Sequence, residues 1–398
     1  MDKIRLGVIG IGGMGSGHAK KVVNGQCPDF ILTAVADINP DRLTWAKENL
    51  GADIACFATA EKMLDSGLVD ACIVATPHYD HPSLAIACME RNIHVLVEKP
   101  AGVYTKQVEE MNAVADNHPD VVFAIMLNQR TNHIYRKMKE LVASGKYGQI
   151  RRTNWIITNW YRPQAYYNSG SWRATWSGEG GGVLVNQSPH QLDLWQWICG
   201  MPVKVQAHMK FGKWHDIEVE DDVTAYVEYA NGATGVFITS TGDACGSNRF
   251  EIQMDGAKLV AEHDKLTVME FEMSEQEFSR TAVSKFAEMK VTEIPIETDE
   301  LNPQHVGVIN AWGSAILRGE PLVADGREGI NGLALSNAMH LSAWQNRMVE
   351  IPLDGDIFYA ELEDRIQSSR EMKNMNASEA QSAESATGEH HKRWDTNW

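Results

Sequence analysis

A glycine-rich turn directly after the first apolar strand is the feature that most constrains this fold. Residues 4–9, with the sequence IRLGVI, lead into the pattern Gly10-x-Gly12-x-x-Gly15. We expect Gly10 to permit a tight turn, Gly12 to admit a pyrophosphate, and Gly15 to bring a helix close to the strand. The pattern therefore predicts a βαβ unit that binds a dinucleotide at the N-terminus of its first helix.

Apolar runs recur up to about residue 127. Strands are predicted at residues 31–36, 71–75, 95–97 and 121–126, with helical segments between them. Near-continuous apolar strands separated by helices are typical of a parallel sheet that is covered on both faces. We predict an α/β Rossmann domain, a doubly wound parallel sheet, over residues 1–127.

The pattern changes after residue 127. Residues 222–229 and 234–239 alternate apolar and polar side chains, and Asn231-Gly232 between them is a strong hairpin signal. We predict an α+β domain over residues 128–367, with an open-faced, mainly antiparallel sheet. An uncovered sheet face is a candidate interface, so a homodimer or homotetramer is expected.

The C-terminal tail, residues 368–398, is rich in Glu, Ser, Ala and Asn. So little apolar surface gains too little from burial to offset the ordering entropy, which favours disorder. Trp394 and Trp398 lie beside the basic run 390–393, which favours docking on a neighbouring subunit instead. Both interpretations of the tail stay open.

Composition argues against several classes of partner. The 398 residues carry a formal net charge of −17, whereas nucleic acids and anionic membranes select basic surfaces. No apolar run approaches the ~20 residues of a membrane helix, and no secretion signal is evident. The six cysteines form no C-x-x-C pair, so neither a metal site nor a disulfide framework is predicted. We expect a cytoplasmic protein without metal.

Strand ends downstream extend the predicted nucleotide site. Asp37 follows the second strand about twenty residues after the glycines, where a ribose-binding acid belongs. No arginine adjoins Asp37, which favours NAD over NADP, although Arg42 could reach a 2′-phosphate. His81 could instead cap a helix or pack in the core. Further predicted cofactor contacts are Gly13, Met14, Thr76, Pro77, His78, His81, Glu98 and Lys99.

Lys99 stands at a strand end suited to chemistry. The strand 95–97 leads into Glu98-Lys99-Pro100, and the proline disfavours helical geometry at Lys99. Lysine can serve as an acid, a base or a cationic stabiliser. The alternative is an ion-paired surface lysine.

A second chemical candidate lies in the glycine-rich segment 180–193. It contains three glycines, Asn186-Gln187, and His190 followed one turn later by Asp193. Histidine has a pKa suited to proton transfer at neutral pH, although a lone histidine is often structural. Upstream, residues 155–176 are rich in Trp and Tyr; core packing explains most of these rings, but aromatic faces mixed with polar groups also suit a pyranose.

Together these motifs resemble the glucose–fructose oxidoreductase / inositol dehydrogenase family, Gfo/Idh/MocA. The glycine fingerprint, Ala75-Thr76-Pro77, Glu98-Lys99-Pro100 and the segment ending His190-x-x-Asp193 occur in the family's order, up to about Pro352. The resemblance implies that Lys99 lies between nicotinamide and substrate and that His190 accepts a proton. Asn186 departs from the family, where aspartate is common, so it can orient a hydroxyl but no proton relay through it is expected.

The resemblance implies an NAD-dependent oxidoreductase acting on a secondary hydroxyl of a sugar, glycoside or cyclitol. Oxidation at C3 of a glucopyranoside is favoured, with inositol oxidation next. A redox-neutral glycosidase or lyase acting through a transient 3-keto sugar and a non-catalytic NAD-binding regulator are the alternatives. The implied catalytic residues are Lys99, His190, Asn186 and Asp193. Asn128 joins the cofactor contacts, and the implied substrate contacts are Lys99, Arg130, Trp160, Arg162, Tyr167, Trp172, Arg173, Asn186 and His190.

Overall fold

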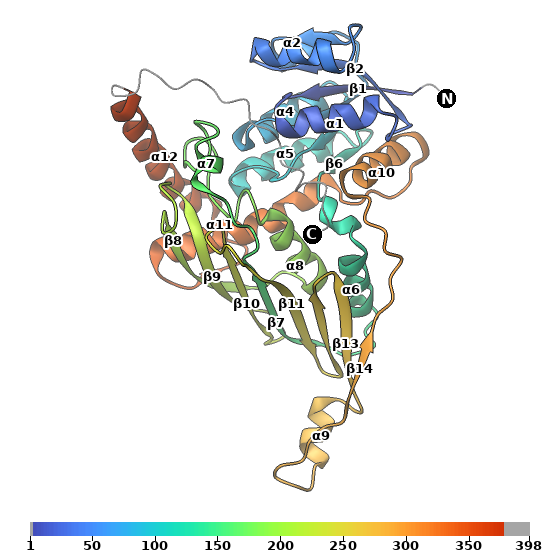
Figure 1. Cartoon of the computed structure of the whole chain (residues 1–398), viewed down its shortest axis with the longest axis vertical. Helices are drawn as coiled ribbons and strands as arrows, with labels where there is room; N and C mark the ends of the chain where they lie inside the picture. Colours follow the sequence, from blue (N-terminus) through green and yellow to red (C-terminus); the bar gives the residue numbers. More distant parts are fainter. Residues whose placement is uncertain (1–2, 378–398) are drawn as a thin grey trace. The chain divides into compact units, whose positions relative to one another are not determined.

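The computed structural model describes residues 3–377, with side chains described as far as residue 370. The chain forms two compact units (Figure 1). Within the described residues, the first comprises residues 3–131, 178–180 and 303–333, and the second comprises residues 132–177, 181–302 and 334–377. A single boundary near residue 127 was expected, so the return of residues 303–333 to the first unit is a difference.

The first unit is built on a six-stranded parallel sheet, as predicted. Its strand order is β3-β2-β1-β4-β5-β6, and the order reverses beside β1, which is where doubly wound sheets bind ligands. The strands are β1 (Ile4–Ile9), β2 (Phe30–Ala36), β3 (Ala55–Phe57), β4 (Ala71–Val74), β5 (His94–Val97) and β6 (Phe123–Ile125). The edge strand β3 was not predicted because it is short and only partly buried.

Helices cover both faces of this sheet, which explains the near-continuous apolar strands. They are α1 (Gly13–Val23), α2 (Pro40–Asn49), α3 (Ala60–Leu64), α4 (His81–Met89), α5 (Thr105–Asn117) and α10 (Gln304–Arg318). Trp312 of α10 stacks on Phe30 of β2 at 5.2 Å between ring centroids and donates to the carbonyl of Val122 at 3.2 Å. This buried apolar stripe is the physical reason that α10 belongs to the first unit.

The second unit is built on a nine-stranded sheet. Its order is β14-β13-β12-β11-β7-β10-β9-β8-β15, and among the described strand pairs of this sheet only β10 and β7 are parallel. The strands are β7 (Ile150–Ile157), β8 (Lys204–Phe211), β9 (Glu220–Glu228), β10 (Thr234–Ser240), β11 (Asn248–Met254), β12 (Ala257–Glu262), β13 (Lys265–Phe271), β14 (Val291–Pro295) and β15 (Val349–Glu350). The predicted mainly antiparallel sheet is confirmed, and Gly232 supplies the positive φ of the β9–β10 hairpin.

Aromatic packing identifies the covered face of this sheet. Trp155 stacks on Phe250 at 4.2 Å, and Phe237 stacks on Trp195 at 5.4 Å between ring centroids. The helices of this unit are α6 (His133–Ala143), α7 (Gln164–Tyr167), α8 (Pro189–Cys199), α9 (Glu275–Thr281), α11 (Gly329–Gln345), whose first residues belong to the first unit, and α12 (Gly355–Ala377). On the other face, Tyr226 and Ile156 are exposed, as an open-faced sheet requires.

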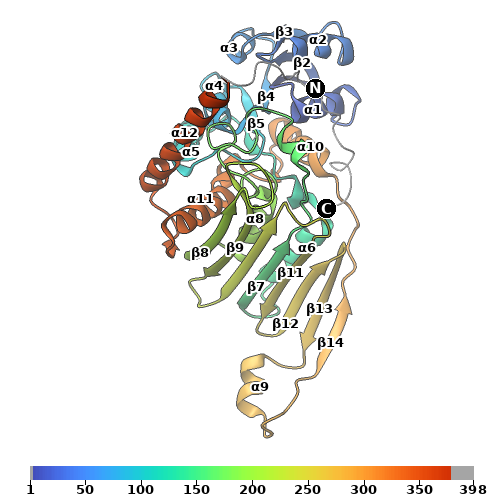
Figure 2. The ribbon, with the colours of Figure 1, turned by 60° about the vertical axis from the view of Figure 1, so that its left-hand side comes forward.

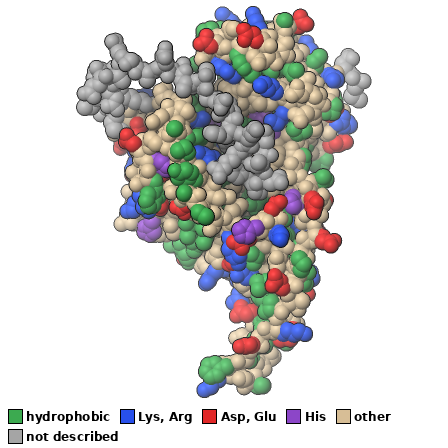
Figure 3. Space-filling view, viewed as in Figure 1, with side chains coloured by type: hydrophobic (Ala, Val, Ile, Leu, Met, Phe, Trp, Pro, Cys, Tyr) green, Lys and Arg blue, Asp and Glu red, His purple; other side chains and the backbone are tan. Residues whose placement is uncertain are grey.

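The C-terminal helix of this unit extends into the segment that was predicted to be a tail. Residues 368–377, expected in the tail, continue α12, and residues 378–398 lie outside the described residues. The short helix α9 projects beyond the sheet at the end of the β13–β14 hairpin (Figures 1 and 2). The loop after α9 leaves Val283 and Phe286 fully or largely exposed, and Figure 3 shows hydrophobic and basic side chains at this end.

Candidate active site

The three glycines of the first turn have three different surroundings. Gly10 has a φ of +86°, and a Cβ there would lie 2.7 Å from the carbonyl oxygen of Ala75. A Cβ on Gly15 would lie 1.8 Å from the Gly10 carbonyl oxygen, whereas one on Gly12 would meet nothing within 4 Å. The helix α1 begins at Gly13 with no side-chain cap and no acidic residue in its first turn. This open cradle of backbone N–H groups fits a pyrophosphate.

Asp37 joins the glycine turn to the end of β2. Its Oδ2 accepts the N–H of Ile11 at 2.7 Å, and its Oδ1 accepts the N–H of Asn39 at 2.8 Å. Each carboxylate oxygen retains a second lone pair for a ribose hydroxyl. The next side chain, Ile38, is 90% exposed and offers an apolar surface. Arg42 donates from Nε to the Ile11 carbonyl at 2.6 Å.

Lys99 follows β5 and is half-buried. Its backbone N–H donates to Oε2 of Glu98 at 3.0 Å. Oε1 of this buried carboxylate lies 2.6 Å from Nε2 of His18 on α1. Burial alone would raise the pKa of Glu98, but the hydrogen bond and charge of His18 lower it to about 2. Glu98 is therefore an ionised carboxylate held directly behind Lys99.

The two predicted histidines of the loop after β4 are both buried. Nδ1 of His78 lies 3.0 Å from the Glu179 carbonyl oxygen. His81 lies between two loops, with Nδ1 2.7 Å from the Pro100 carbonyl oxygen and Nε2 2.8 Å from that of Thr76. Burial lowers the pKa of His81, although both carbonyls oppose that shift. These contacts favour the packing interpretation of His81 over direct cofactor contact.

The turn after β6, η2 (Asn128–Thr131), is buried as a whole. Nδ2 of Asn128 donates to Oε1 of Gln304. Arg130 is buried and pairs with Glu328 at 2.7 Å between Nη1 and Oε2. Asn128 and Arg130, the two predicted contact residues of this turn, therefore both bind side chains within the first unit.

In the second unit, a buried carboxylate holds the glycine-rich segment. Glu220, at the start of β9, accepts the N–H of Gly182 at 2.8 Å and that of Leu184 at 3.0 Å. Its Oε2 also lies 2.9 Å from Nε2 of His340 on α11. A Cβ on Gly182 would lie 2.0 Å from the Glu220 carbonyl oxygen, so only glycine fits there. Neither Glu220 nor His340 was predicted from sequence.

The same segment leads into α8, which carries the predicted proton acceptor. His190, Asn186 and Asp193 are all buried, and His190 lies in the first turn of α8. Oδ1 of Asp193 accepts a hydrogen bond from Nε2 of Gln196 at 2.9 Å. The segment is thus fixed on both sides of His190, by Glu220 before it and by the helix after it.

The aromatic segment contributes a polar hub that was missed. The hydroxyl of Tyr166 accepts a hydrogen bond from Nη1 of Arg173 at 2.9 Å and donates to Oδ1 of Asn186 at 3.5 Å. The guanidinium carbons of Arg162 and Arg173 lie 5.2 Å and 4.6 Å from its ring centroid. Tyr167, a predicted substrate contact, is buried and donates to Oγ1 of Thr241 at 2.8 Å. Sequence gave no signal to choose between adjacent tyrosines. Of the two predicted tryptophans, Trp160 is buried and Trp172 is half-buried beneath Arg173.

Comparison with known proteins decides the family. A model described as "Oxidoreductase family, NAD-binding Rossmann fold" matches residues 4–126, and one described as "GFO/IDH/MocA C-terminal domain" matches residues 135–260. The chain belongs to the Gfo/Idh/MocA family. It is an oxidoreductase with an NAD-binding Rossmann fold, and the resemblance drawn from the sequence motifs is confirmed.

Several Gfo/Idh/MocA relatives match over most of the chain. The chain is 24% identical to the myo-inositol 2-dehydrogenase of Thermotoga maritima, over 87% of this chain and 98% of the relative. It is 25% identical to the levoglucosan dehydrogenase of Pseudarthrobacter phenanthrenivorans, over 67% and 75%. A solved structure of the WlbA dehydrogenase from Bordetella pertussis, in complex with NADH and UDP-GlcNAcA, matches with a TM-score of 0.73 and 26% identity, over 89% and 100%.

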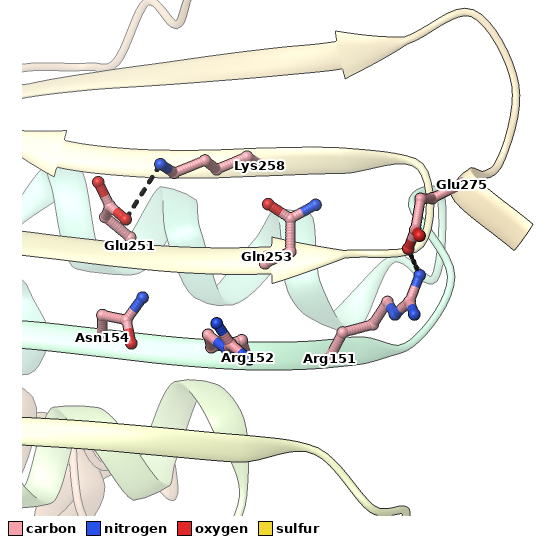
Figure 4. A pocket seen from close by; sticks show the side chains of 7 residues that line it. All are labelled: Arg151, Arg152, Asn154, Glu251, Gln253, Lys258 and Glu275. Carbon is pink, nitrogen blue, oxygen red and sulfur yellow. Dashed lines mark ion pairs between the residues drawn. The ribbon is translucent and has the colours of Figure 1, made fainter. Parts of the chain in front are cut away.

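A separate depression of about 470 Å³ lies on the uncovered face of the second unit's sheet (Figure 4). Its lining residues are Arg151, Arg152, Asn154, Glu251, Gln253, Lys258 and Glu275. Lys258 pairs with Glu251 at 3.0 Å, and Arg151 pairs with Glu275. It contains no predicted site residue of this Gfo/Idh/MocA protein. Among the described residues no cluster of His, Cys, Asp and Glu could hold a metal ion, and no helix within residues 3–377 is long and apolar enough to cross a membrane.

Proposed function

We propose that this protein oxidises a secondary hydroxyl of a sugar, glycoside or cyclitol. The observation that carries the proposal is Lys99, held at the end of β5 in the same unit as the open glycine cradle. Both features lie at the carboxyl edge of one parallel sheet, where such sheets bind ligands. When bound, NAD⁺ supplies the hydride acceptor.

Three side chains have distinct parts in the proposed reaction. Lys99 stabilises the alkoxide that develops as the hydroxyl is oxidised, because a preorganised cation favours that charge. His190 removes the hydroxyl proton. Asn186 and Asp193 orient His190 and the substrate, and the amide oxygen of Asn186 accepts a hydrogen bond from the hydroxyl of Tyr166.

The surroundings of Asp37 support NAD over NADP. Asp37 presents a carboxylate at the end of β2, and the 2′-phosphate of NADP would be repelled by that charge. Arg42 is already engaged by the Ile11 carbonyl, and its guanidinium lies 4.6 Å from the Trp45 ring centroid. Titration of protein fluorescence with NADH and NADPH measures both dissociation constants. Equal or tighter binding of NADPH would reject this preference.

Oxidation at C3 of a glucopyranoside is our preferred reaction. The hub of Tyr166, Arg173 and Asn186 combines an aromatic ring with hydrogen-bonding groups, which suits the C–H face and hydroxyls of a pyranose. Inositol oxidation is the alternative, favoured by the 98% coverage of the Thermotoga maritima inositol dehydrogenase. NMR of the product after incubation with glucosides and inositols separates them, and a ketone at another carbon rejects the preference for C3.

Substitution tests the assigned residues directly. We expect Lys99→Ala and His190→Ala each to lower kcat by about 100-fold or more, with NADH binding little changed. Near wild-type turnover in either variant would remove that residue from the mechanism. Cleavage of the glycosidic bond without accumulating NADH would point instead to the redox-neutral glycosidase or lyase, in which the hydride returns to the transient 3-keto sugar.

We also propose a cytoplasmic homodimer or homotetramer formed through the open face of the nine-stranded sheet. Ile156 and Tyr226 are exposed on this face. Light scattering of wild type and of Tyr226→Glu measures the oligomeric state, and a monomeric wild type would overturn the proposal.

A further inference from the structure

A buried histidine on α1 stands behind the strand end that carries Lys99. His18 has no exposed surface, and its Nε2 lies 2.6 Å from Oε1 of Glu98. The other oxygen of Glu98 accepts the backbone N–H of Lys99 at 3.0 Å. We infer that His18 is a positioning residue for Lys99 and acts through Glu98. This inference rests on the proposed function, in which Lys99 contacts the reacting hydroxyl.

The contact between His18 and Glu98 joins two parts of the sheet that are not adjacent. In the sheet order, β4 separates β1 from β5, so the turn that begins α1 and the end of β5 are not on adjacent strands. The helix α1 starts in the glycine cradle, and Gly15 locks it against the Gly10 carbonyl. His18 on that same helix then reaches Glu98. One rigid helix therefore sets both the cofactor cradle and the main chain of Lys99.

Energetics also favour a positioning role over simple stabilisation. Removing two groups from water costs several kcal/mol, and an apolar pair of similar volume often serves stability equally well. The carboxylate is nevertheless retained and ionised, as its lowered pKa indicates. An ionised acceptor binds a backbone N–H more strongly than a neutral one, so the charge strengthens the bond between Glu98 and the main chain of Lys99.

A second buried histidine holds the other side of Lys99. Nδ1 of His81 lies 2.7 Å from the carbonyl oxygen of Pro100, and its other ring nitrogen faces Thr76. The main chain is thus restrained before Lys99 by Glu98 and after it by His81.

The test compares His18→Phe, which keeps a ring but removes the donor, with His18→Gln, which keeps an amide donor. We expect His18→Phe to lower kcat by about 100-fold, since a displacement near 1 Å can cost that much. The dissociation constant of NADH and KM should change by less than about threefold. His18→Gln should recover most of kcat. Without cofactor, the peptide spanning residues 97–103 should take up deuterium faster in His18→Phe.

The matched control is His305→Phe. His305 is buried on α10 with its ring centroid 5.5 Å from that of His18, but it is outside the proposed contact chain. Wild-type kcat and deuterium uptake in His18→Phe would overturn the inference, as would equal losses in His305→Phe. If His18→Phe does not fold, His18→Gln with unchanged protection of residues 97–103 supports the inference, and lost protection in that variant overturns it. Normal turnover in Lys99→Ala would reject the proposed function, while deuterium uptake would still test the contact itself.

Discussion

Each unit places a buried histidine within 3 Å of a buried glutamate that binds backbone N–H groups, but only His18 forms a hydrogen bond with its glutamate. In the first, His18 faces Glu98, which binds the N–H of Lys99; in the second, His340 faces Glu220, which binds backbone N–H groups of the glycine-rich segment. Glu98 is the sequence neighbour of the residue it holds, whereas Glu220 is 38 and 36 residues from Gly182 and Leu184. The first pair therefore fixes one residue, and the second fixes a whole loop.

The surroundings of the two histidines differ as well. His18 lies beside another imidazole, that of His305, at 5.5 Å between ring centroids. His340 lies beside Trp176 and Trp344 at 5.8 Å and 5.4 Å. The first pair is an electrostatic cluster, and the second is a polar pair enclosed by indole rings. This contrast predicts that the first controls turnover and pH response, whereas the second controls stability.

The largest expected effect is on the loop contact. Glu220→Ala leaves the N–H groups of Gly182 and Leu184 without their acceptor in a buried site and removes the carboxylate that lies 2.9 Å from Nε2 of His340. We expect a loss of about 3–5 kcal/mol in the free energy of unfolding. Glu220→Gln keeps an acceptor and should lose about half as much. Urea unfolding followed by circular dichroism measures both, and equal losses would show that charge rather than hydrogen bonding dominates.

The sequence predicted the strand end that contains Glu98 and Lys99, but it did not predict the contact between Glu220 and His340. The spacing of the first-turn glycines and the run at 98–100 are local patterns, so their strand ends were predictable. Glu220 and His340 meet the glycine-rich segment only through the tertiary fold, and a buried Glu at a strand start carries no local signal. The position of α10 in the first unit was not predicted for the same reason. The apolar face of a helix does not indicate which sheet the helix covers.

The next expected effect is the pH dependence of the free energy of unfolding, which we expect from the His18–His305 cluster. Burial and the charge of His18 lower the pKa of His305 from 6.5 to about 3. As the pH falls, the unfolded chain therefore protonates His305 at a higher pH than the folded chain does. The stability that is present above pH 6.5 is lost as the pH falls towards 3, by about 1.4 kcal/mol per pH unit. Glu98, with a pKa lowered from 4.5 to about 2, contributes only below pH 4.5.

Between pH 6.5 and 4.5 the effect of His305 can therefore be measured without that of Glu98. We expect the free energy of unfolding of wild type to fall by up to about 3 kcal/mol more than that of His305→Phe over this interval. Urea titrations at pH 6.5, 5.5 and 4.5 give the two slopes. Parallel slopes would mean that His305 is protonated in the folded protein, and the contrast between the two clusters would lose its electrostatic basis.

The smallest effect is expected for His340→Phe. The ring replacement conserves volume beside Trp176 and Trp344, and Glu220 keeps both backbone donors. We expect a loss of about 1–2 kcal/mol in the free energy of unfolding, which is typical of a single buried substitution that conserves volume but removes a polar group. Because the contact fixes a loop and not a reacting side chain, kcat should fall much less than in His18→Phe. A comparable fall in kcat would mean that both pairs position catalytic groups, since α8 and His190 follow the segment that Glu220 holds.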